Sequence, residues 1–331
     1  MNALVTRPAP LRAPRRAAVA IADEAVRDLC DALGVPMIDA ARPGAPGLMA
    51  PGVLLRAADG WVHPGPPTAW PDFAVMIESM TSSSPRSASP RHANRAPGTP
   101  RRDGRGLPDL SMLSAEAIDR EAGEWGLPVA AVREGPAPAP EVPWPTRAPR
   151  DLDARVVVLG ATWAAPLAGR VLRDLGADVV RVVDPRRPDP FPLRDQLISD
   201  QRVVGLDLGT SAGRDAFALL LERADVLVDG TTPRVLRNVG LDRTPVPIVR
   251  IAAFAEGERP GYGLAAEARG GWAARHDPPR LGRSSVADPV AGLLAVLLAV
   301  DVLHRGTSGS RARISLEEAV GHLLALEGGD G

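Results

Sequence analysis

One stretch of the chain, from Arg155 to Asp184, limits its fold more than any other. Four apolar residues in a row, Val156 to Leu159, end at a glycine and are typical of a buried parallel strand. A helical pattern with apolar residues three and four positions apart follows, and a second apolar strand at 179–183 ends on Asp184. Strand, helix and strand form a βαβ unit, whose ligands bind at the carboxyl ends of the strands. The sequence therefore predicts an α/β fold with its site at that edge.

Later segments extend this pattern. Strands are predicted at 203–208, 225–228 and near 248–254, and helices at 212–223 and 289–303. We therefore expect a Rossmann-like parallel sheet with flanking helices over residues 151–331, plus a smaller mixed α+β portion before it.

The amino-terminal half divides by composition into three segments. Residues 1–80 predict a small mixed portion, with a helix at 17–34 and a hairpin that turns at Asp59–Gly60. Residues 81–106 are rich in Arg, Ser, Ala and Pro and contain no large apolar residue, which predicts a disordered linker. Residues 107–150 predict a short helix at 114–125 and a proline-rich connector.

Composition excludes several function classes. The net charge of −1 over 331 residues gives no reason to expect a nucleic-acid or membrane partner. All 39 basic residues are arginine, so a Schiff-base lysine and a Walker lysine are excluded. Cys30 is the only cysteine and the five histidines are scattered, so we expect no disulfide and no metal site. Residues 1–20 lack a continuous apolar segment, and we expect a cytoplasmic protein.

Two motifs suggest functions that their surroundings disfavour. The first turn of the βαβ unit has Gly160 and Gly169 nine residues apart rather than the close glycines of a dinucleotide-binding turn. Residues 209–213 match the GxSxG pattern of serine hydrolases, with Ser211 as the nucleophile. The simpler interpretation is that Thr210 or Ser211 caps the helix that follows.

A third candidate is Asp288, which precedes Pro289 and a long apolar helix. Proline at the first helical position would make Asp288 the N-cap, stabilised by free N–H groups and by the helix dipole. The alternative is a carboxylate nucleophile at the mouth of a buried helix. The residues alone leave both interpretations open.

Six segments, in order, resemble the family III coenzyme A transferases, the superfamily that includes formyl-CoA transferase and α-methylacyl-CoA racemase. They include LRDLGADVVRVVDP, QRVVGLDLGTSAGRDAF, RADVLVDGTTPRVLRNVGL, RPGYGLAAEARGG, PPRLGRSSVADPVAGLLAVLLAVDVLHR and GTSGSRARISLEEAVGHLLAL. The resemblance covers about Arg155 to Leu326. Two short amino-terminal segments, within 57–73 and 115–134, resemble the carboxyl-terminal segment of the family, so the order of parts is rearranged.

The resemblance implies roles for particular residues. Asp288 takes the position of the catalytic aspartate, which attacks the acyl-CoA thioester and becomes an aspartyl-CoA thioester. Gly270 and Gly271 match a glycine loop whose N–H groups would stabilise an oxyanion, and Gly263 stands where the family usually has an aspartate. The residues expected to bind CoA are Thr162, Trp163, Ala164, Asp184, Gly230, Thr231, Gly270 and Gly271.

The resemblance also implies the substrates and the assembly. We expect no permanently bound cofactor, with CoA and acyl-CoA as substrates and a carboxylic acid as the acceptor. Family members are homodimers, so we expect a homodimer or a heterodimer with a related chain. The long apolar helix at 290–303, apolar on nearly every side, adds to this expectation because it must be buried all round. The main alternative is a catalytically inactive homologue that binds a partner subunit, and a GxSxG hydrolase is the third.

Overall fold

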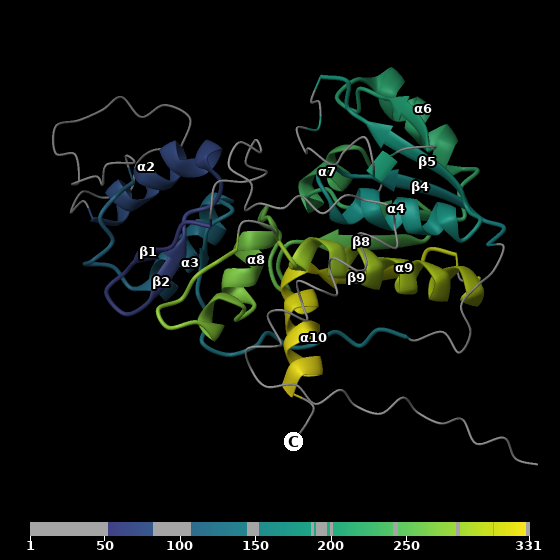
Figure 1. The fold of residues 1–331 in the computed structure, drawn as a ribbon. Coiled ribbons are helices and arrows are strands. Elements are labelled where there is room, and N and C mark those ends of the chain that lie inside the picture. The colour runs from purple at the N-terminus through teal and green to yellow at the C-terminus, as the bar shows by residue number, and fades with distance from the viewer. Residues whose placement is uncertain are drawn as a thin grey trace, which may run out of the picture.

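The structure, a computed structural model, describes residues 52–81, 107–143, 152–186, 189, 197–198, 201–240, 244–282, 285–306 and 308–328. They form a small amino-terminal subdomain and a larger sheet domain (Figure 1). The helix expected at 17–34 lies outside the described residues, as does the linker expected at 81–106 except for Thr81, which ends a helix.

A six-stranded parallel sheet forms the centre of the sheet domain, with the strand order β6-β5-β4-β7-β8-β9. The strands are β4 (Arg155–Leu159), β5 (Asp178–Val183), β6 (Arg202–Gly205), β7 (Val226–Asp229), β8 (Ile248–Ala252) and β9 (Arg311–Ser315). From β4 the chain adds β5 and β6 on one side of the sheet, and then β7, β8 and β9 on the other side. The loops that follow the neighbouring strands β4 and β7 therefore lead in opposite directions, and α/β proteins bind ligands at the carboxyl ends of such a strand pair. The predicted Rossmann-like α/β fold is confirmed; β9 is an additional strand.

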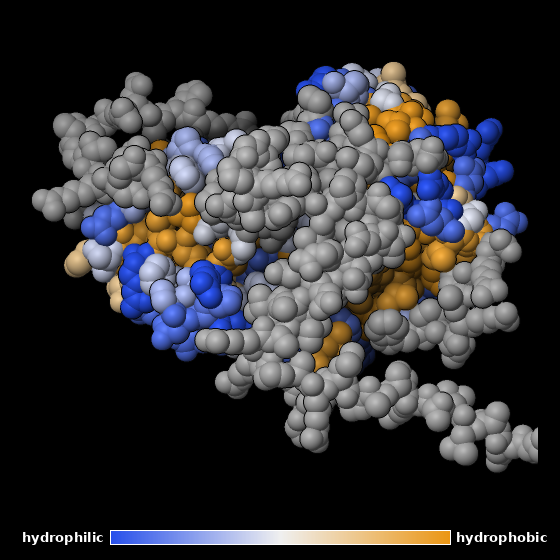
Figure 2. All heavy atoms as spheres, viewed as in Figure 1, coloured by the Kyte–Doolittle hydropathy of each residue, from blue (hydrophilic) through white to orange (hydrophobic). Residues whose placement is uncertain are grey.

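Helices cover both faces of the sheet because successive strand residues point to opposite sides. Val156 and Val158 of β4 belong to the core shared with α4 (Ala164–Asp174), α9 (Ala287–Arg305) and α10 (Leu316–Gly328). Val157 and Leu159 belong to the core on the other face, shared with α6 (Ser211–Leu221). A short helix, α7 (Pro233–Asn238), follows β7. Figure 2 shows apolar residues over the α4 and α9 region on the visible face.

The long apolar helix α9 is a core helix of this chain. By length and composition it could cross a bilayer, but 67% of its most apolar window is buried inside the structure. It packs against α4, α10 and the sheet. At the contact with α4, a Cβ atom on Gly292 would lie 2.7 Å from the carbonyl oxygen of Ala164, so only glycine allows this close approach. The chain itself buries most of α9, so the apolar composition of this helix is not by itself evidence for a second subunit.

The amino-terminal subdomain is built from two stretches of the chain, one before and one after residues 82–106. Its small antiparallel sheet joins β1 (Leu55–Arg56), β2 (Trp61–His63) and β3 (Ala130–Ala131). Its helices are η1 (Pro67–Ala69), α2 (Trp70–Thr81) and α3 (Ala115–Trp125). The predicted hairpin and the predicted short helix are both present, and Ser114 caps α3 by accepting a hydrogen bond from the backbone of Ala117. Residues of 57–77 and 107–129 share one hydrophobic core, so they form a single unit.

Two further helices connect the parts. α8 (Gly263–Arg269) lies between the subdomain and α9, and the single turn η3 (Ala273–Arg275) contacts α8. α8 contacts β2 and β3 on one side and α9 and α10 on the other.

Candidate active site

An open cavity of about 860 Å³ begins at the carboxyl ends of β4 and β7 and extends along β8 and β9. Its walls come from the loops after β4 and β7, from strands β8 and β9, and from the segment 253–262 that follows β8. The site is therefore at the edge that the βαβ pattern predicts. Of the residues expected to bind CoA, Thr162, Ala164, Gly230 and Thr231 line this cavity.

Asp288 also lines the cavity, in the first turn of α9. The N-cap interpretation of Asp288 is wrong, because Val286 is the N-cap of α9. The Asp288 side chain is buried, with 7% of the residue exposed. The helix starts two residues earlier than the proline suggests, because Pro289 has no N–H and fits equally well later in the first turn, where N–H groups have no partner within the helix.

Ser285 and Glu267 occupy the N-terminus of α9 instead. The Ser285 hydroxyl accepts hydrogen bonds from the N–H groups of Ala287 (3.1 Å) and Asp288 (3.3 Å). Oε1 of Glu267 accepts from the N–H groups of Val286 (2.7 Å) and Ala287 (3.4 Å). Burial raises the pKa of Asp288 to about 6, while a hydrogen bond from Ser285 opposes that rise.

Glu267 is a buried carboxyl group that the sequence did not identify. It is 1% exposed, and burial together with the nearby Asp288 raises its pKa to about 8, against the lowering effect of its hydrogen bonds. Glu267 is therefore mostly protonated at neutral pH, which leaves Asp288 as the charged member of the pair. A single acid in a short, alanine-rich helix carries no motif that would reveal this.

The loop after β7 is held in shape by Asp229, the last residue of that strand. Asp229 is fully buried, and its Oδ1 accepts bonds from the N–H (3.0 Å) and hydroxyl (2.7 Å) of Thr231. Arg250 of β8 donates to Oδ2 of Asp229 (3.0 Å) and to the carbonyl oxygen of Thr231 (2.8 Å). Burial raises the pKa of Asp229 to about 6, although Arg250 opposes it. This pair fixes the cavity wall formed by Gly230 and Thr231.

The loop after β4 is fixed at Thr162. Its φ of 68° is in the left-handed region that residues other than glycine rarely adopt, and its N–H donates to Asp189 (2.8 Å). The neighbouring Trp163 is buried beside the loop and is not part of the cavity lining.

Asp184, Gly270 and Gly271 lie away from the cavity lining. Asp184 accepts hydrogen bonds from the backbone and side chain of Arg186 in the turn after β5. The N–H groups of Gly270 and Gly271 donate to the carbonyl oxygens of Ala266 and Ala268, so in this arrangement they do not serve as oxyanion donors. The proposed contacts of these residues and of Trp163 with CoA remain predictions.

Arginines outnumber carboxylates on the cavity wall. The lining arginines are Arg237, Arg250, Arg259, Arg311 and Arg313, and the lining acids among the described residues are Glu258 and Asp288. Each arginine also contacts protein groups; Arg311, for example, donates to four backbone carbonyl oxygens. Four of them form ion pairs with acids, Arg237 with Glu258, Arg250 with Asp229, Arg259 with Asp119 and Arg313 with Glu318, so most of this positive charge is balanced within the protein.

The hydrolase motif has a structural explanation. The hydroxyl of Thr210 accepts a hydrogen bond from the N–H of Gly213 (3.1 Å) and so caps α6, while Ser211 is exposed at the first helical position, outside the cavity lining. Within the described ranges, no group of three or more His, Cys, Asp or Glu side chains is placed to hold a metal ion.

Comparisons with known proteins give the following matches. Residues 152–328 match the family model described as CoA-transferase family III. The chain is 28% identical over 209 residues to a succinyl-CoA–D-citramalate CoA-transferase of Chloroflexus aurantiacus, covering 53% of this chain and 51% of that protein. It is 30% identical over 187 residues to a probable fatty acyl-CoA transferase of Mycobacterium tuberculosis, covering 47% of each. The chain thus spans about half the length of these relatives.

Among solved structures, a CaiB/BaiF family protein from Brucella suis aligns with a TM-score of 0.46 and 25% identity, covering 54% of this chain and 56% of that one. A hypothetical protein from Mycobacterium tuberculosis aligns with a TM-score of 0.47 and 24% identity, covering 55% and 58%.

Proposed function

Because this chain belongs to CoA-transferase family III, we propose that it moves coenzyme A between an acyl-CoA thioester and a carboxylic acid, with Asp288 as the nucleophile. The burial of Asp288 on the cavity wall carries this proposal. The other lining acid among the described residues, Glu258, is exposed and forms an ion pair with Arg237 at 2.6 Å. Asp288 is therefore the carboxylate that a bound thioester could meet away from bulk water.

The local environment suits a nucleophilic carboxylate. With a pKa of about 6, Asp288 is mostly ionised at pH 7 and yet more basic than an exposed aspartate. The N-terminus of α9 and the hydroxyl of Ser285 favour the charged form. Glu267, mostly protonated at that pH, adds little repulsion.

Transfer then takes four steps in which the Asp288 carboxylate is consumed and regenerated. It attacks the thioester carbonyl and expels CoA thiolate, giving an aspartyl-acyl anhydride. The thiolate attacks the aspartyl carbonyl, releases the first carboxylate and leaves an aspartyl-CoA thioester. The acceptor carboxylate attacks this thioester and again expels the thiolate, forming a second anhydride. The thiolate finally attacks the new acyl carbonyl, which yields the new acyl-CoA and free Asp288.

The arginines of the cavity wall support binding of CoA, whose phosphate groups are anionic. Arg250 is on β8, and Arg311 and Arg313 are on the edge strand β9; all three line the cavity together with Asp288. Guanidinium groups recognise phosphate oxygens with paired, charge-assisted hydrogen bonds. Binding of CoA would account for these arginines on the cavity wall.

A covalent adduct is the direct test. The protein is incubated with a panel of acyl-CoAs and analysed intact by mass spectrometry. We expect a CoA adduct that peptide mapping places on Asp288 and that is lost in Asp288→Asn. Glu258→Gln is the matched control, since it changes the other lining acid, and it should keep the adduct. If no acyl-CoA is consumed and no adduct forms, the transferase proposal fails in favour of an inactive homologue.

We also propose that the protein acts in the cytoplasm as a homodimer or as a heterodimer with a related chain. The assembly proposal rests on the family membership alone, because most of α9 is already buried within the chain. Sedimentation at micromolar concentration would show a monomer if the assembly proposal is wrong, and cell fractionation would test the location.

A further inference from the structure

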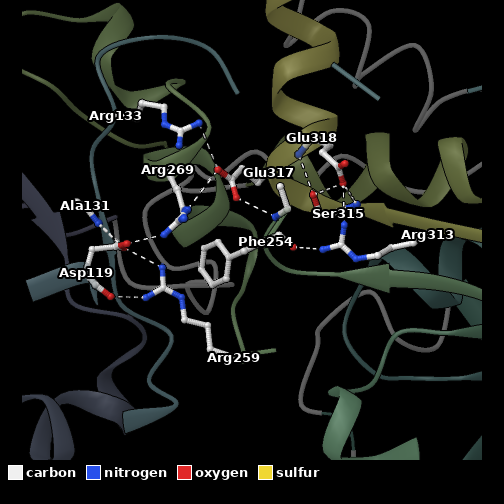
Figure 3. A network of polar contacts seen from close by, with 11 residues as sticks. Asp119, Ala131, Arg133, Phe254, Arg259, Arg269, Arg313, Ser315, Glu317 and Glu318 are labelled. Atoms are coloured by element: carbon white, nitrogen blue, oxygen red, sulfur yellow. Dashed lines mark hydrogen bonds and ion pairs between the residues drawn. The ribbon is translucent and has the colours of Figure 1, made fainter. Parts of the chain in front are cut away.

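The segment 253–262 forms one wall of the cavity and connects β8 to α8. It contributes Phe254, Arg259 and Tyr262, among others, to the lining. A connecting segment of this kind is held in one shape only where its backbone and side chains are bonded to neighbouring elements. Two acidic residues from different parts of the chain provide such bonds (Figure 3).

The first is Glu317, at the start of α10 in the sheet domain. Its N–H donates to the carbonyl oxygen of Ala253 (3.1 Å), and its Oε2 accepts from the N–H of Ala255 (2.9 Å). Its Oε1 pairs with Arg269 of α8 (3.3 Å) and with Arg133 (3.7 Å). Glu317 therefore holds the beginning of the segment.

The second is Asp119, on α3 of the amino-terminal subdomain. Arg259 donates to its backbone carbonyl oxygen (2.8 Å) and to its Oδ1 (2.8 Å), while Arg269 pairs with its Oδ2. The N–H of Ala131 donates to the same Oδ1 (3.1 Å). The guanidinium of Arg259 also lies 4.3 Å from the ring centre of Phe254, so one side chain links Asp119 to the cavity wall.

The burial of this contact makes it more than a surface ion pair. The side chains of Arg259 and Asp119 are 6% and 15% exposed. Exposed ion pairs contribute little, whereas loss of one partner of a buried pair leaves the other charge uncompensated. Without the Asp119 carboxylate, Arg259 would keep its bond to the backbone carbonyl oxygen but its buried charge would be uncompensated, so we expect the segment to be held less firmly.

We propose that Asp119 is a positioning residue through which the amino-terminal subdomain holds the 253–262 wall of the cavity in its binding shape. Asp119 lies outside the residues that match the family model, 152–328, so the matched part alone would lack this contact. The identity of the ligand rests on the proposed function, but the contact itself does not.

The test compares Asp119→Asn with Glu124→Gln, which removes an exposed carboxylate from the same helix. In the absence of ligand, amide hydrogen exchange of peptides covering 254–262 should rise about tenfold or more in Asp119→Asn and stay unchanged in the control. The Kd for CoA should rise about fivefold or more in the same variant. With the acyl-CoA that gives the adduct, KM should rise while kcat stays within about twofold, because α9 and Asp288 are held by Ser285 and Glu267 instead.

Arg259→Lys is a second variant, because lysine keeps the charge but lacks the planar fork from which Arg259 donates to two Asp119 oxygens with two different nitrogens. It should raise exchange in the same peptides. Unchanged exchange in both variants would overturn the proposal. So would a fall in kcat together with a fall in stability while KM stays unchanged. If the wild-type chain binds no CoA, the proposed function fails, and the exchange measurement alone still decides the role of Asp119.

Discussion

The backbone of Gly263 lies directly against the carboxyl group of Asp288. A Cβ atom on Gly263 would overlap Oδ2 of Asp288 and Oγ of Ser285. The resemblance to the CoA-transferases places an aspartate at this position in the usual family pattern, and this backbone has no room for any side chain. The absence of a side chain at Gly263 is thus part of how Asp288 is held.

Replacing Gly263 by alanine should therefore reduce transfer. The added methyl group must displace the Asp288 carboxyl group or α8, so we expect kcat to fall about tenfold or more and the free energy of unfolding to fall by about 1–3 kcal/mol. Gly135→Ala is the control, because a Cβ atom there meets no other atom within 4 Å. Steady-state kinetics and urea unfolding measure the two effects; full activity in Gly263→Ala would show that Asp288 is not the group that reacts.

The raised pKa of Glu267 predicts how the free energy of unfolding depends on pH. Its pKa is raised from 4.5 to about 8, so between these values the folded state binds more protons than the unfolded state. Stability from this group is therefore greatest below about pH 4.5, falls as the pH rises and reaches its minimum above about pH 8. Glu267→Gln keeps the acceptor oxygen for Val286 and Ala287 but cannot ionise.

We expect Glu267→Gln to be more stable than the wild type at pH 9 and to differ less from it at pH 5. Urea unfolding at the two pH values measures this difference. Glu116→Gln, which changes an exposed acid on α3, should show no such dependence. A constant difference between Glu267→Gln and wild type across the range would mean that Glu267 is ionised at all of these pH values.

The sheet domain was predictable because its strands and helices have strong local patterns. Val156 to Leu159 is apolar on both faces and could only be a buried strand, and the α4 pattern matched the observed helix. Strand β9 was missed although Arg311 and Arg313 alternate with Ala312 and Ile314, which is the pattern of a half-buried strand. The signal is weak because Ile314 is the only large apolar residue in this five-residue strand.

The site was only partly predictable. The sequence pattern identified β7, which Gly230 and Thr231 follow, and α9, whose first turn contains Asp288. The fold brings these three residues to one cavity. The contacts of Glu267 with α9 and of Asp119 with Arg259 join residues separated by long stretches of sequence, and no local pattern encodes such pairs. They depend on how α3, α8 and α9 pack.

The pair of Arg250 and Asp229 gives a prediction about stability. Asp229 is fully buried and the Arg250 side chain is 16% exposed, so Arg250→Met leaves a buried carboxylate without its counter-charge. We expect a loss of about 3–5 kcal/mol in the free energy of unfolding at pH 8. The loss should be smaller at pH 5, where Asp229 can take up a proton.

The matched control is Arg202→Met, which breaks the exposed ion pair with Asp178 on the same sheet. Its expected effect is less than about 1 kcal/mol. Guanidinium unfolding of both variants at both pH values makes the comparison. Equal losses in the two variants would show that burial of Asp229 does not determine the strength of its pair.

The pKa of Asp288 predicts an acid limb in the rate of transfer. Only the ionised carboxylate can attack the thioester, so with a pKa of about 6 the rate at pH 5 should be about a tenth of its plateau above pH 7. Ser285→Ala removes a hydrogen bond that lowers this pKa, so the limb should move to higher pH. Ser308→Ala, which changes an exposed hydroxyl bonded to Pro245, should leave the limb in place. A rate that stays constant down to pH 5 in a folded protein, or a limb that Ser285→Ala does not move, would mean that a group other than Asp288 starts the reaction.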